Sequence, residues 1–480
     1  MKKKIILVLL TISLFCHLVW GETNRSVVND GNGSADQMAV QNMCRAIQIA
    51  DSAILHHFTS NGMARYYYPR TDTRSGEKAS VWMYTSSIEA VNAILRGLKA
   101  HKEHGNAGLY EAHFGRYAGL LDTLYANLAW YRGTFTLTSY TQTKEWSVYG
   151  VDRGRAKGTA RVEGIYNVYD DQQWLIREML ESYKITGNDR YLEEAEYLAS
   201  YVLDGWDGTL DSNGKEHGGI TWGPGYVTKH SCSNGPMVSP LVWLYELYKG
   251  DQATITYLYI DTDGRRKTRQ LRKDEYYLQF AEAVYQWQKN HLLRDDGVYH
   301  DMMGGCDPNC HVAYETIDGI KYRRHNHLRH AGGKAYTYNC GTMLSGAADL
   351  YRATGESVYL DDAKKLSGAS FSYFAKMGTT IPGHYTYPIG GFSNWFNGVL
   401  MRGYVDVYPS YRDIGKCIDS FQQNLDHGYQ FLYRGTLPSD LLQGWNVDEE
   451  KNKTEGMFSF TFAAEYAILA QYQLEKGSCL

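Results

Sequence analysis

The chain has 480 residues, a formal net charge of −4 at pH 7 and no long basic block. That balance gives no indication of binding to nucleic acid or anionic lipid. The unusual quantity is the aromatic content, with 41 Tyr and 11 Trp. Such side chains fit both the apolar faces and the hydroxyl rims of sugar rings, but an aromatic-rich helical core would account for them as well.

The N-terminus has the pattern of a secretory signal peptide. Lys2–Lys4 precede the apolar run Ile5–Phe15, and Val19-Trp20-Gly21 provides small residues at a cleavage site. We expect residues 1–21 to be removed. Cys16 lacks the residues of a lipoprotein signal before it, so lipidation is not expected. The sequence predicts an exported protein without a transmembrane segment, located in the periplasm, at the cell surface or outside the cell.

Residues 22–36 are polar and predict a flexible tether, and residues 37–480 predict a single catalytic domain. Seven cysteines remain after the leader, an odd number that is no disulfide framework. Cys306 and Cys310 are spaced to close a small loop in an oxidising compartment. A zinc site with His311 or with the histidines of 325–330 would meet no standard spacing, so we expect neither metal nor cofactor.

An internal repeat indicates the architecture. Thr186–Leu198 recurs as Thr354–Leu366, and Asp274–Val284 carries the same pattern between them. Each copy follows an amphipathic segment, and Gly187, Gly250 and Gly355 lie just beyond those segments, as C-cap glycines do. The repeating unit is therefore a helix, a glycine turn, a second helix and a long loop.

The 3.6-residue periodicity extends this pattern to two alternating sets of helices. The set rich in small and aromatic residues should crowd round an axis, and lies near 84–100, 168–184, 234–249, 338–353, 394–409 and 457–474. The more charged set should face solvent, near 37–58, 111–131, 190–203, 273–291, 357–374 and 411–432. We predict an all-α fold, an (α/α)6 toroid (barrel) of six helical hairpins, with an open solenoid as the alternative. The long loops should precede inner helices and gather on one face. Residues 132–163 and 254–260 predict strand-like hairpin inserts, the first beside the cleft.

Two adjacent carboxylates, Asp170 and Asp171, begin the second inner helix at the mouth of this toroid. They are a helix start in the simplest interpretation, with Asp170 as N-cap and Gln173 completing a capping box. Glycosidic cleavage also needs two carboxyl groups, and neighbouring like charges push their pKa values apart. The other Asp-Asp pairs differ in setting. Asp361-Asp362 lies on an outer helix and Asp295-Asp296 in a turn.

An aromatic residue beside an amide recurs where the inner helices begin, which suits stacking on a sugar while hydrogen-bonding its hydroxyls. Caps and core packing are the competing explanation. The residues that we predict to bind substrate are Gln173, Trp174, Trp82, Tyr84, Trp222, Asn234, Tyr338, Asn339 and Trp395.

Several motifs, in order along nearly all of the predicted mature chain, resemble glycoside hydrolase family 76, the α-1,6-mannanases. They are Tyr169-Asp-Asp-Gln-Gln-Trp174, Gly218-Gly-Ile-Thr-Trp222, Cys232-Ser-Asn-Gly-Pro236, Tyr338-Asn-Cys-Gly341 and the Thr-Gly turns of the repeat. The resemblance implies an (α/α)6 fold and retaining endo-hydrolysis of α-1,6-mannan backbones, with Asp170 as nucleophile and Asp171 as acid/base. Cys340 stands where the family pattern has Gln, and the insert at 132–163 is long.

The expected substrate is α-1,6-mannan or its oligosaccharides, cleaved by a monomer that binds no nucleic acid. Two rival functions remain open. One is another (α/α)6 glycan enzyme, exo-acting, inverting or uronyl-cleaving, with a different carboxylate across the cavity. The other is a non-catalytic glycan-binding protein of the same fold. Transglycosylation is less favoured, because the C-terminal residues form no anchor signal.

Overall fold

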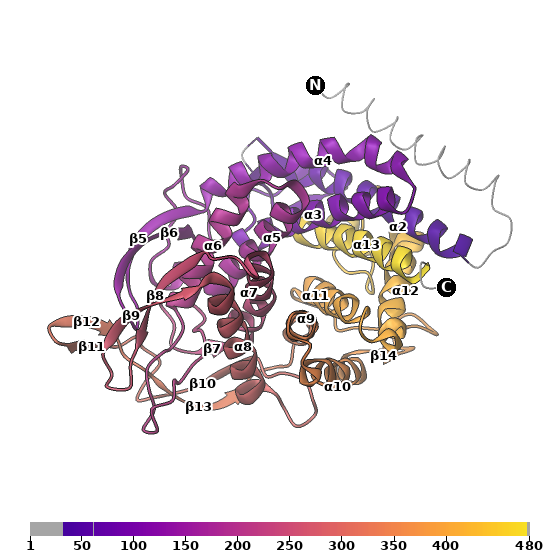
Figure 1. Ribbon diagram of the computed structural model, residues 1–480. Coiled ribbons are helices and arrows are strands. Elements are labelled where there is room, and N and C mark those ends of the chain that lie inside the picture. Colours follow the sequence, from indigo (N-terminus) through magenta and orange to yellow (C-terminus); the bar gives the residue numbers. More distant parts are fainter. Residues whose placement is uncertain (1–31, 61, 478–480) are drawn as a thin grey trace.

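The computed structural model describes residues 32–60 and 62–477 (Figure 1). The predicted signal peptide and most of the predicted tether lie outside the described residues. The first described helix begins at Asn32, so the last five residues assigned to the tether are helical. Within these ranges no helix combines the length and the apolar character needed to span a bilayer.

Twelve α-helices make up most of the described chain, and each predicted helix is present. The inner helices are α3 (Val81–Glu103), α5 (Tyr169–Thr186), α7 (Gly235–Tyr248), α9 (Thr337–Thr354), α11 (Ser393–Val407) and α13 (Gly456–Gly477). The outer helices are α2 (Asn32–His57), α4 (Ala107–Asn127), α6 (Asp189–Asp204), α8 (Lys273–Leu292), α10 (Ser357–Phe374) and α12 (Gly415–Leu432).

The inner helices form a closed ring. Each packs against the next in the order α3, α5, α7, α9, α11 and α13, and α13 packs in turn against α3. The first outer helix, α2, lies against the last inner one, so the two ends of the domain complete the sixth hairpin (Figure 1). The fold is thus an (α/α)6 toroid and not an open solenoid.

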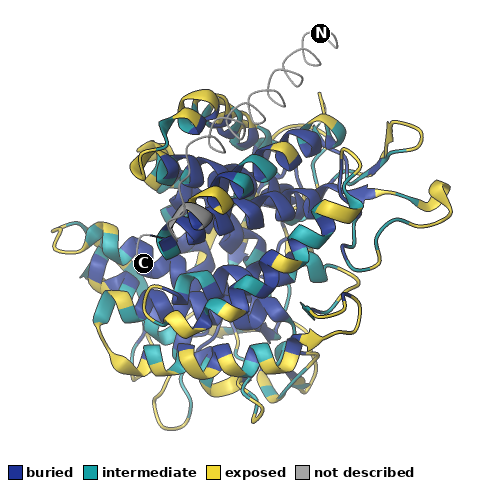
Figure 2. Ribbon diagram, turned by 90° about the vertical axis from the view of Figure 1, so that its right-hand side faces the viewer, coloured by how far each residue is buried: buried dark blue, intermediate teal, exposed yellow. Residues whose placement is uncertain are grey.

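Burial separates the two sets of helices, as their composition predicts. Almost every described side chain of α13 is buried, and so is the run 337–350 of α9, whereas the outer helices expose one face (Figure 2). Small residues permit this crowding. A Cβ on Gly341 would lie 2.4 Å from the carbonyl oxygen of Val399, so only glycine allows α9 and α11 to approach so closely.

The connections lie mainly as predicted, with one exception. Gly187 and Gly355 end α5 and α9 in the left-handed conformation, with φ of +70° and +76°. Gly250, with φ of +80°, lies one residue beyond Lys249, the C-cap of α7. The expectation that every long loop precedes an inner helix is wrong for residues 249–272, which carry a hairpin into the outer helix α8.

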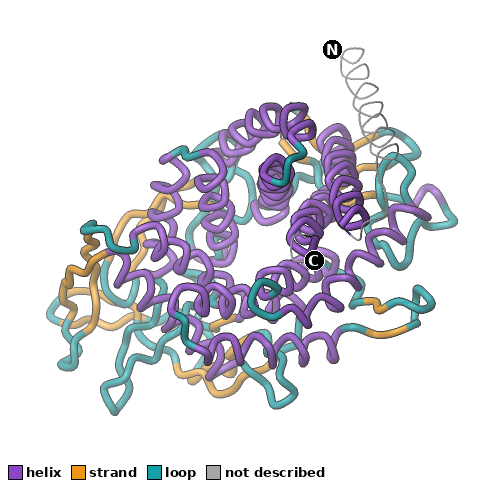
Figure 3. Tube along the Cα trace, turned by 45° about the vertical axis from the view of Figure 1, so that its right-hand side comes forward, coloured by secondary structure: helices purple, strands orange, loops and turns teal. Residues whose placement is uncertain are grey.

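Both predicted hairpin inserts are present. They are β5 (Arg132–Thr138) with β6 (Thr143–Tyr149), and β8 (Thr254–Ile260) with β9 (Arg266–Arg272). The remaining strands are short and lie round the helical ring (Figure 3), as β1 (Phe58–Thr59) with β2 (Gly62–Met63), β11 (Tyr314–Ile317) with β12 (Ile320–Arg323), β14 (Lys376–Met377) with β15 (Tyr385–Thr386), and the three-stranded sheets β16-β3-β4 (Thr454–Glu455, Tyr66–Tyr68, Thr73–Arg74) and β13-β10-β7 (His327–Gly332, Met302–Asp307, Lys229–His230).

The predicted disulfide joins Cys306 at the end of β10 to Cys310 in the following loop. These two sulfurs are therefore not available as metal ligands. The described residues contain no group of three or more His, Cys, Asp or Glu side chains arranged to hold a metal ion.

Candidate active site

A cavity of about 730 Å³ opens where five of the six inner helices begin. The starts of α3, α5, α9 and α11 and the segment before α7 each contribute side chains. The residues that form its polar and aromatic lining are Ser80, Trp82, Asp170, Asp171, Trp174, Trp222, Tyr226, His230, Cys232, Asp301, Lys334, Tyr336, Tyr338, Phe392, Ser393, Trp395 and Phe396. The ring of helices thus brings together in one site residues that lie more than 300 positions apart in the sequence, such as Ser80 and Phe396.

Asp170 and Asp171 lie in the first turn of α5 and face this cavity. The helix begins at Tyr169, and its N-cap is Val168 with no side-chain capping bond. The backbone N–H of Tyr169 instead donates to the carbonyl of Trp222 at 2.8 Å. The simple interpretation of Asp170 as an N-cap is therefore wrong, because backbone pairing with the Trp222 loop places the N-cap two residues earlier, at Val168.

The environment separates the two carboxyl groups electrostatically. Burial raises the pKa of Asp170 to about 6, while the Cys232 thiol and the Trp222 indole lie close enough to favour its charged form. Burial raises the pKa of Asp171 well above its ordinary value, and the charges of Asp170 and Asp152 raise it further. These shifts favour negative charge on Asp170 and a proton on Asp171.

Asp170 also has an unused hydrogen-bonding atom. Its Oδ1 is buried and has no hydrogen-bond partner among the described residues. A buried carboxylate oxygen without a donor is costly. Such an atom is suited to a group that arrives with the substrate, either a hydroxyl hydrogen or an electrophilic carbon.

Tryptophans form one wall of the cavity. The Trp395 ring meets those of Trp82 and Trp174 edge-on, with centroids 5.1 Å and 4.9 Å away. Next to them, Tyr338 stacks on Phe396 with centroids 4.3 Å apart. These rings are held in place by one another, so the wall is a preformed platform for the apolar faces of sugar rings.

Trp222 forms a second aromatic surface on the loop that precedes α7. Its ring stacks on His230 at 4.7 Å and lies against Tyr226 at 4.5 Å. Burial lowers the pKa of His230 to about 4, so its imidazole is neutral at physiological pH. Arg323, which is fully buried, donates to the Pro224 carbonyl at 3.2 Å and holds the loop from outside the cavity.

A buried ion pair fixes the other end of this loop. The Lys229 ammonium lies 2.8 Å from Asp207 and 2.5 Å from the carbonyl oxygen of Gly218, and His325 Nδ1 lies 2.8 Å from the same Asp207 carboxylate. Burial opposes ionisation of Asp207, but Lys229 and His325 together lower its pKa below the ordinary range. The conformation of the loop that carries Trp222 thus depends on the ionised state of Asp207 and its pairing with Lys229.

Of the residues predicted to bind substrate, Trp82, Trp174, Trp222, Tyr338 and Trp395 line the cavity. The structure places the other four elsewhere. Tyr84 is buried and donates to the Leu124 carbonyl at 2.9 Å, because two helical residues beyond Trp82 the chain faces the outer helix α4. The three predicted amides are fully buried. Among the described residues that line the cavity, none of the three is present: Gln173, Asn234 and Asn339.

Two of these amides have clear structural partners. Asn234 accepts from the Ile220 N–H at 2.8 Å and donates to the carbonyl of His230 at 2.7 Å, and Gln173 donates to the Ser233 carbonyl at 2.7 Å. Both therefore fix the segment between the Trp222 loop and α7. A hydrogen-bonding side chain at a helix start serves the fold here, not the ligand.

Asp301 is the main lining residue that sequence reasoning missed. It follows α8 in an irregular stretch, and burial raises the pKa of its carboxyl group while Asn339 lies close enough to oppose the shift. Its backbone N–H bonds to Gly332, and its carbonyl accepts from Ser231 at 2.7 Å, which brings it to the cavity beside Cys232. No repeat or motif signals this position.

A second hollow, of about 330 Å³, adjoins this cavity. The two share the wall formed by Lys334, Tyr336, Ile389, Ser393 and Phe396. Beyond that wall the adjoining hollow is lined by Tyr373 and Thr386.

An (α/α)6 toroid with an aromatic cavity and two adjacent carboxylates at its mouth defines a glycan-active protein. The family model of glycosyl hydrolase family 76 matches residues 115–257 and 267–423, which is more than half of the chain. The chain belongs to this family, and the resemblance seen in its motifs is confirmed.

Known relatives agree with this assignment. The chain is 26% identical over 169 residues to a mannan endo-1,6-alpha-mannosidase of Candida glabrata, covering 35% of this chain and 29% of the yeast protein. A second such protein, from Saccharomyces cerevisiae, is 26% identical over 184 residues, covering 37% and 32% of the two chains. The matched stretch thus spans about a third of each yeast protein.

Solved structures share the fold. A glycoside hydrolase family 76 mannosidase from Bacteroides thetaiotaomicron superposes with a TM-score of 0.65 at 22% identity, covering 91% of this chain and 100% of that one. An α-1,6-mannanase from Salegentibacter sp. HEL1_6 gives a TM-score of 0.55 at 17% identity, covering 89% and 99%. That structure is an inactive variant, with two adjacent aspartates replaced by asparagine, in complex with α-1,6-mannotriose.

Proposed function

We propose that this protein is an exported, retaining endo-α-1,6-mannanase that acts through Asp170 and Asp171. The observation that carries the proposal is the unequal environment of the two carboxyl groups, which favours charge on Asp170 and a proton on Asp171. A nucleophile and an acid are the two groups that retaining hydrolysis requires. The inactive variant of the Salegentibacter enzyme, changed at two adjacent aspartates, supports the same assignment.

The reaction takes place in two steps. The Asp170 carboxylate attacks the anomeric carbon, the bond from that carbon to the leaving O6 breaks, and Asp171 gives its proton to O6. Asp171 then takes a proton from water, whose oxygen attacks the anomeric carbon and releases Asp170. One water is consumed, both carboxyl groups return to their initial states, and the product keeps the α configuration.

The aromatic walls and the adjoining hollow support action within a chain. Trp395 and Trp222 lie on different elements that border the carboxylate pair, so sugar rings can be held on either side of the bond that breaks. The adjoining hollow beyond Tyr336 gives room for further residues of a polymer. We therefore favour endo action over release of single terminal sugars.

Asp301 supports one specific alternative, an inverting hydrolase. In such an enzyme a second carboxylate across the cavity activates water. Asp301 lies on a different element from the Asp170 pair and lines the same cavity. We rank this function second, because the inactive variant of the Salegentibacter enzyme is changed at two adjacent aspartates, as in the Asp170-Asp171 pair, and not at a separate carboxylate.

The proposal is tested by incubation with unbranched α-1,6-mannan while product sizes are followed over time. A ladder of oligosaccharides is expected, and release of mannose alone would contradict endo action. Replacement of Asp170 and Asp171 by asparagine should abolish the ladder. The same change at Asp295 and Asp296, an adjacent pair in a turn, should leave it intact.

A further inference from the structure

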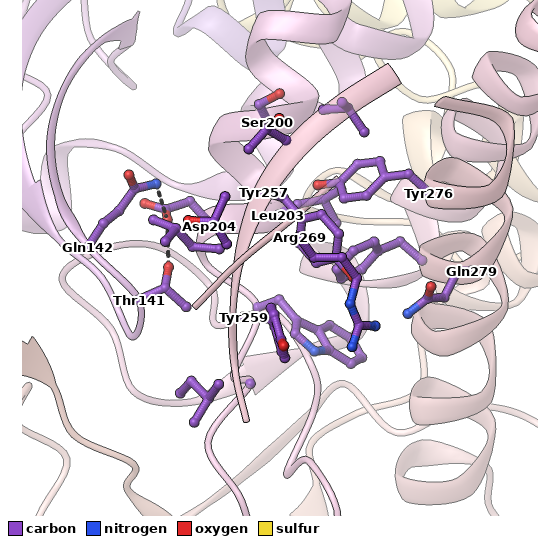
Figure 4. Close-up of a pocket in the computed structure, with 18 of the residues that line it drawn as sticks. Thr141, Gln142, Ser200, Leu203, Asp204, Tyr257, Tyr259, Arg269, Tyr276 and Gln279 are labelled. Atoms are coloured by element: carbon purple, nitrogen blue, oxygen red, sulfur yellow. Dashed lines mark hydrogen bonds between the residues drawn. The ribbon is translucent and has the colours of Figure 1, made fainter. Parts of the chain in front are cut away.

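A second cavity, of about 500 Å³, lies outside the helical ring (Figure 4). Its walls are the hairpins β5–β6 and β8–β9 and the outer helices α6 and α8. It shares no lining residue with the catalytic cavity. Nothing in the mechanism above makes use of it.

Aromatic side chains from three elements form one side of this cavity. Tyr276 of α8 lies 5.0 Å from Tyr257 of β8 and 4.9 Å from Phe280, measured between ring centroids. Trp206 meets Phe280 edge-on at 6.1 Å. Tyr259 is half-buried, with the Arg269 guanidinium 4.4 Å from the centre of its ring. Figure 4 shows Tyr257, Tyr259 and Tyr276 on the same side of the space.

Asp204 provides the polar group opposite these rings. Its Oδ1 accepts hydrogen bonds from Ser139 and from Gln142, each at 2.9 Å, which ties the turn of β5–β6 to the end of α6. The bond from Gln142 is drawn in Figure 4. Its Oδ2 is buried and has no hydrogen-bond partner among the described residues, and burial raises the pKa of this carboxyl group, although the nearby Gln142, Ser139 and Trp146 oppose the shift. An unpaired buried carboxylate oxygen in a cavity is suited to accept a hydroxyl hydrogen from a ligand.

The charges of the lining exclude a strongly anionic ligand. Lys144 and Arg269 are balanced by Asp204 and Glu216. A phosphate or uronate would meet as many carboxylates as cations. Aromatic faces with carboxylate, amide and guanidinium groups at their edges fit a neutral, hydroxyl-rich ring instead.

The walls are held in fixed positions. Arg266 of β9 donates to the Tyr140 carbonyl in the turn of β5–β6 at 3.1 Å, so the two hairpins are joined at their tips. The backbone N–H of Arg323 donates to Ser139 at 2.8 Å, and its side chain reaches Pro224 beside Trp222. The second cavity is therefore connected through one residue to the loop that lines the catalytic cavity.

Part of this cavity lies in a stretch that the family model does not match. The family model leaves residues 258–266 unmatched, and these include Leu258, Tyr259 and Ile260 of its lining. These residues belong to the β8–β9 hairpin, which precedes the outer helix α8 and not an inner helix.

We propose that this cavity is a second, non-catalytic glycan-binding site that holds a neutral pyranose segment of the polysaccharide while the chain is cut elsewhere. The identity of the polysaccharide rests on the proposed function. Binding a remote segment raises the local concentration of cleavable chain at the catalytic cavity.

The test uses the full chain with Asp170→Asn and Asp171→Asn, which binds without cutting. Titration calorimetry with unbranched α-1,6-mannan is compared before and after adding Tyr259→Ala or, separately, Gln279→Ala. Loss of the Tyr259 ring should weaken mannan binding by about two- to tenfold, the loss expected for one aromatic stacking contact. Tyr314→Ala, an exposed tyrosine on the β11–β12 hairpin, is the matched control and should change nothing.

Equal mannan affinity in the parent and in both cavity variants, with thermal unfolding showing intact folds, would overturn the second site. So would absence of mannan binding by the parent. The proposed function fails by a different result, which is failure of the unmodified protein to cleave the same mannan. A gain of affinity for α-1,6-mannotetraose in the Tyr259→Ala variant would also contradict the assignment.

Discussion

The indole Nε1 of Trp395 lies 3.3 Å from Oε2 of Glu89, so the aromatic wall of the catalytic cavity is tied to the charged interior of the toroid. Glu89 also pairs with Arg402 of α11, whose guanidinium is almost fully buried. Arg177 and Glu178 form a second ion pair in the same interior, and both are buried. The ring of inner helices thus encloses a network in which each charge depends on a neighbour.

Replacing Glu89 by alanine should destabilise the protein strongly. Arg402 would lose its hydrogen-bonded partner in a buried setting, and breaking such a pair costs about 3–5 kcal/mol. Equilibrium unfolding in urea measures the change. The matched control is Glu450→Ala, which breaks a pair with Arg70 whose side chains are 72% and 52% exposed, and should cost less than about 1 kcal/mol. Equal losses in the two variants would refute the structural role of Glu89.

Asp207 should make the stability of the protein sensitive to acid. Its pKa is lowered in the folded state, so its ionisation stabilises the fold above the unfolded-state value of about 4. That stabilisation is lost as pH falls below this value towards the folded pKa. The difference in unfolding free energy between the wild type and Asp207→Asn should be largest near pH 7 and shrink below pH about 4. A difference that is independent of pH would show that the Lys229 and His325 contacts carry no net charge effect.

The activity should rise with pH through the ionisation of Asp170 and fall when Asp171 loses its proton. Burial raises the pKa of Asp170 to about 6, and burial together with the charge of Asp170 raises the pKa of Asp171 well above its ordinary value. The profile of kcat/KM against pH should therefore rise with an apparent pKa near 6 and fall at higher pH. Full activity at pH 4, where both carboxyl groups are protonated, would contradict this assignment.

Asp301→Asn separates the two proposed mechanisms. If Asp301 only contacts substrate, its replacement should lower kcat/KM by about tenfold, the value of one hydrogen bond to a charged group. Asp170→Asn should cost at least about 100-fold. The ratio of the two losses is the measurement, made on the same mannan. An Asp301→Asn loss as large as that of Asp170→Asn would favour the inverting function.

The helices and the position of the Asp pair could be predicted from sequence because they depend on local patterns. The repeat of Thr186–Leu198 and the glycines at 187 and 355 report helix ends directly. The orientation of single side chains does not follow from such patterns. Tyr84 and Trp82 share a helix start, yet only Trp82 lines the cavity, because about 200° of helical rotation separates them.

The long-range parts of the site could not be predicted for a similar reason. Asp301 reaches the cavity through backbone pairing with Gly332 and Ser231, contacts between segments that no periodicity connects. The β8–β9 hairpin is predicted correctly as strands, but its place beside the β5–β6 hairpin depends on the Arg266 contact with Tyr140. Contacts of this kind join segments that are distant in sequence, so they follow from the tertiary structure and not from a local pattern.

The anomeric configuration of the first product tests the central claim most directly. Proton NMR of α-1,6-mannan during the first minutes of hydrolysis distinguishes the two configurations before they equilibrate in solution. Attack by Asp170 with proton transfer from Asp171 predicts new reducing ends that are α at first and become mixed later. Reducing ends that are β at first would contradict a covalent intermediate on Asp170 and would assign the second carboxylate to Asp301.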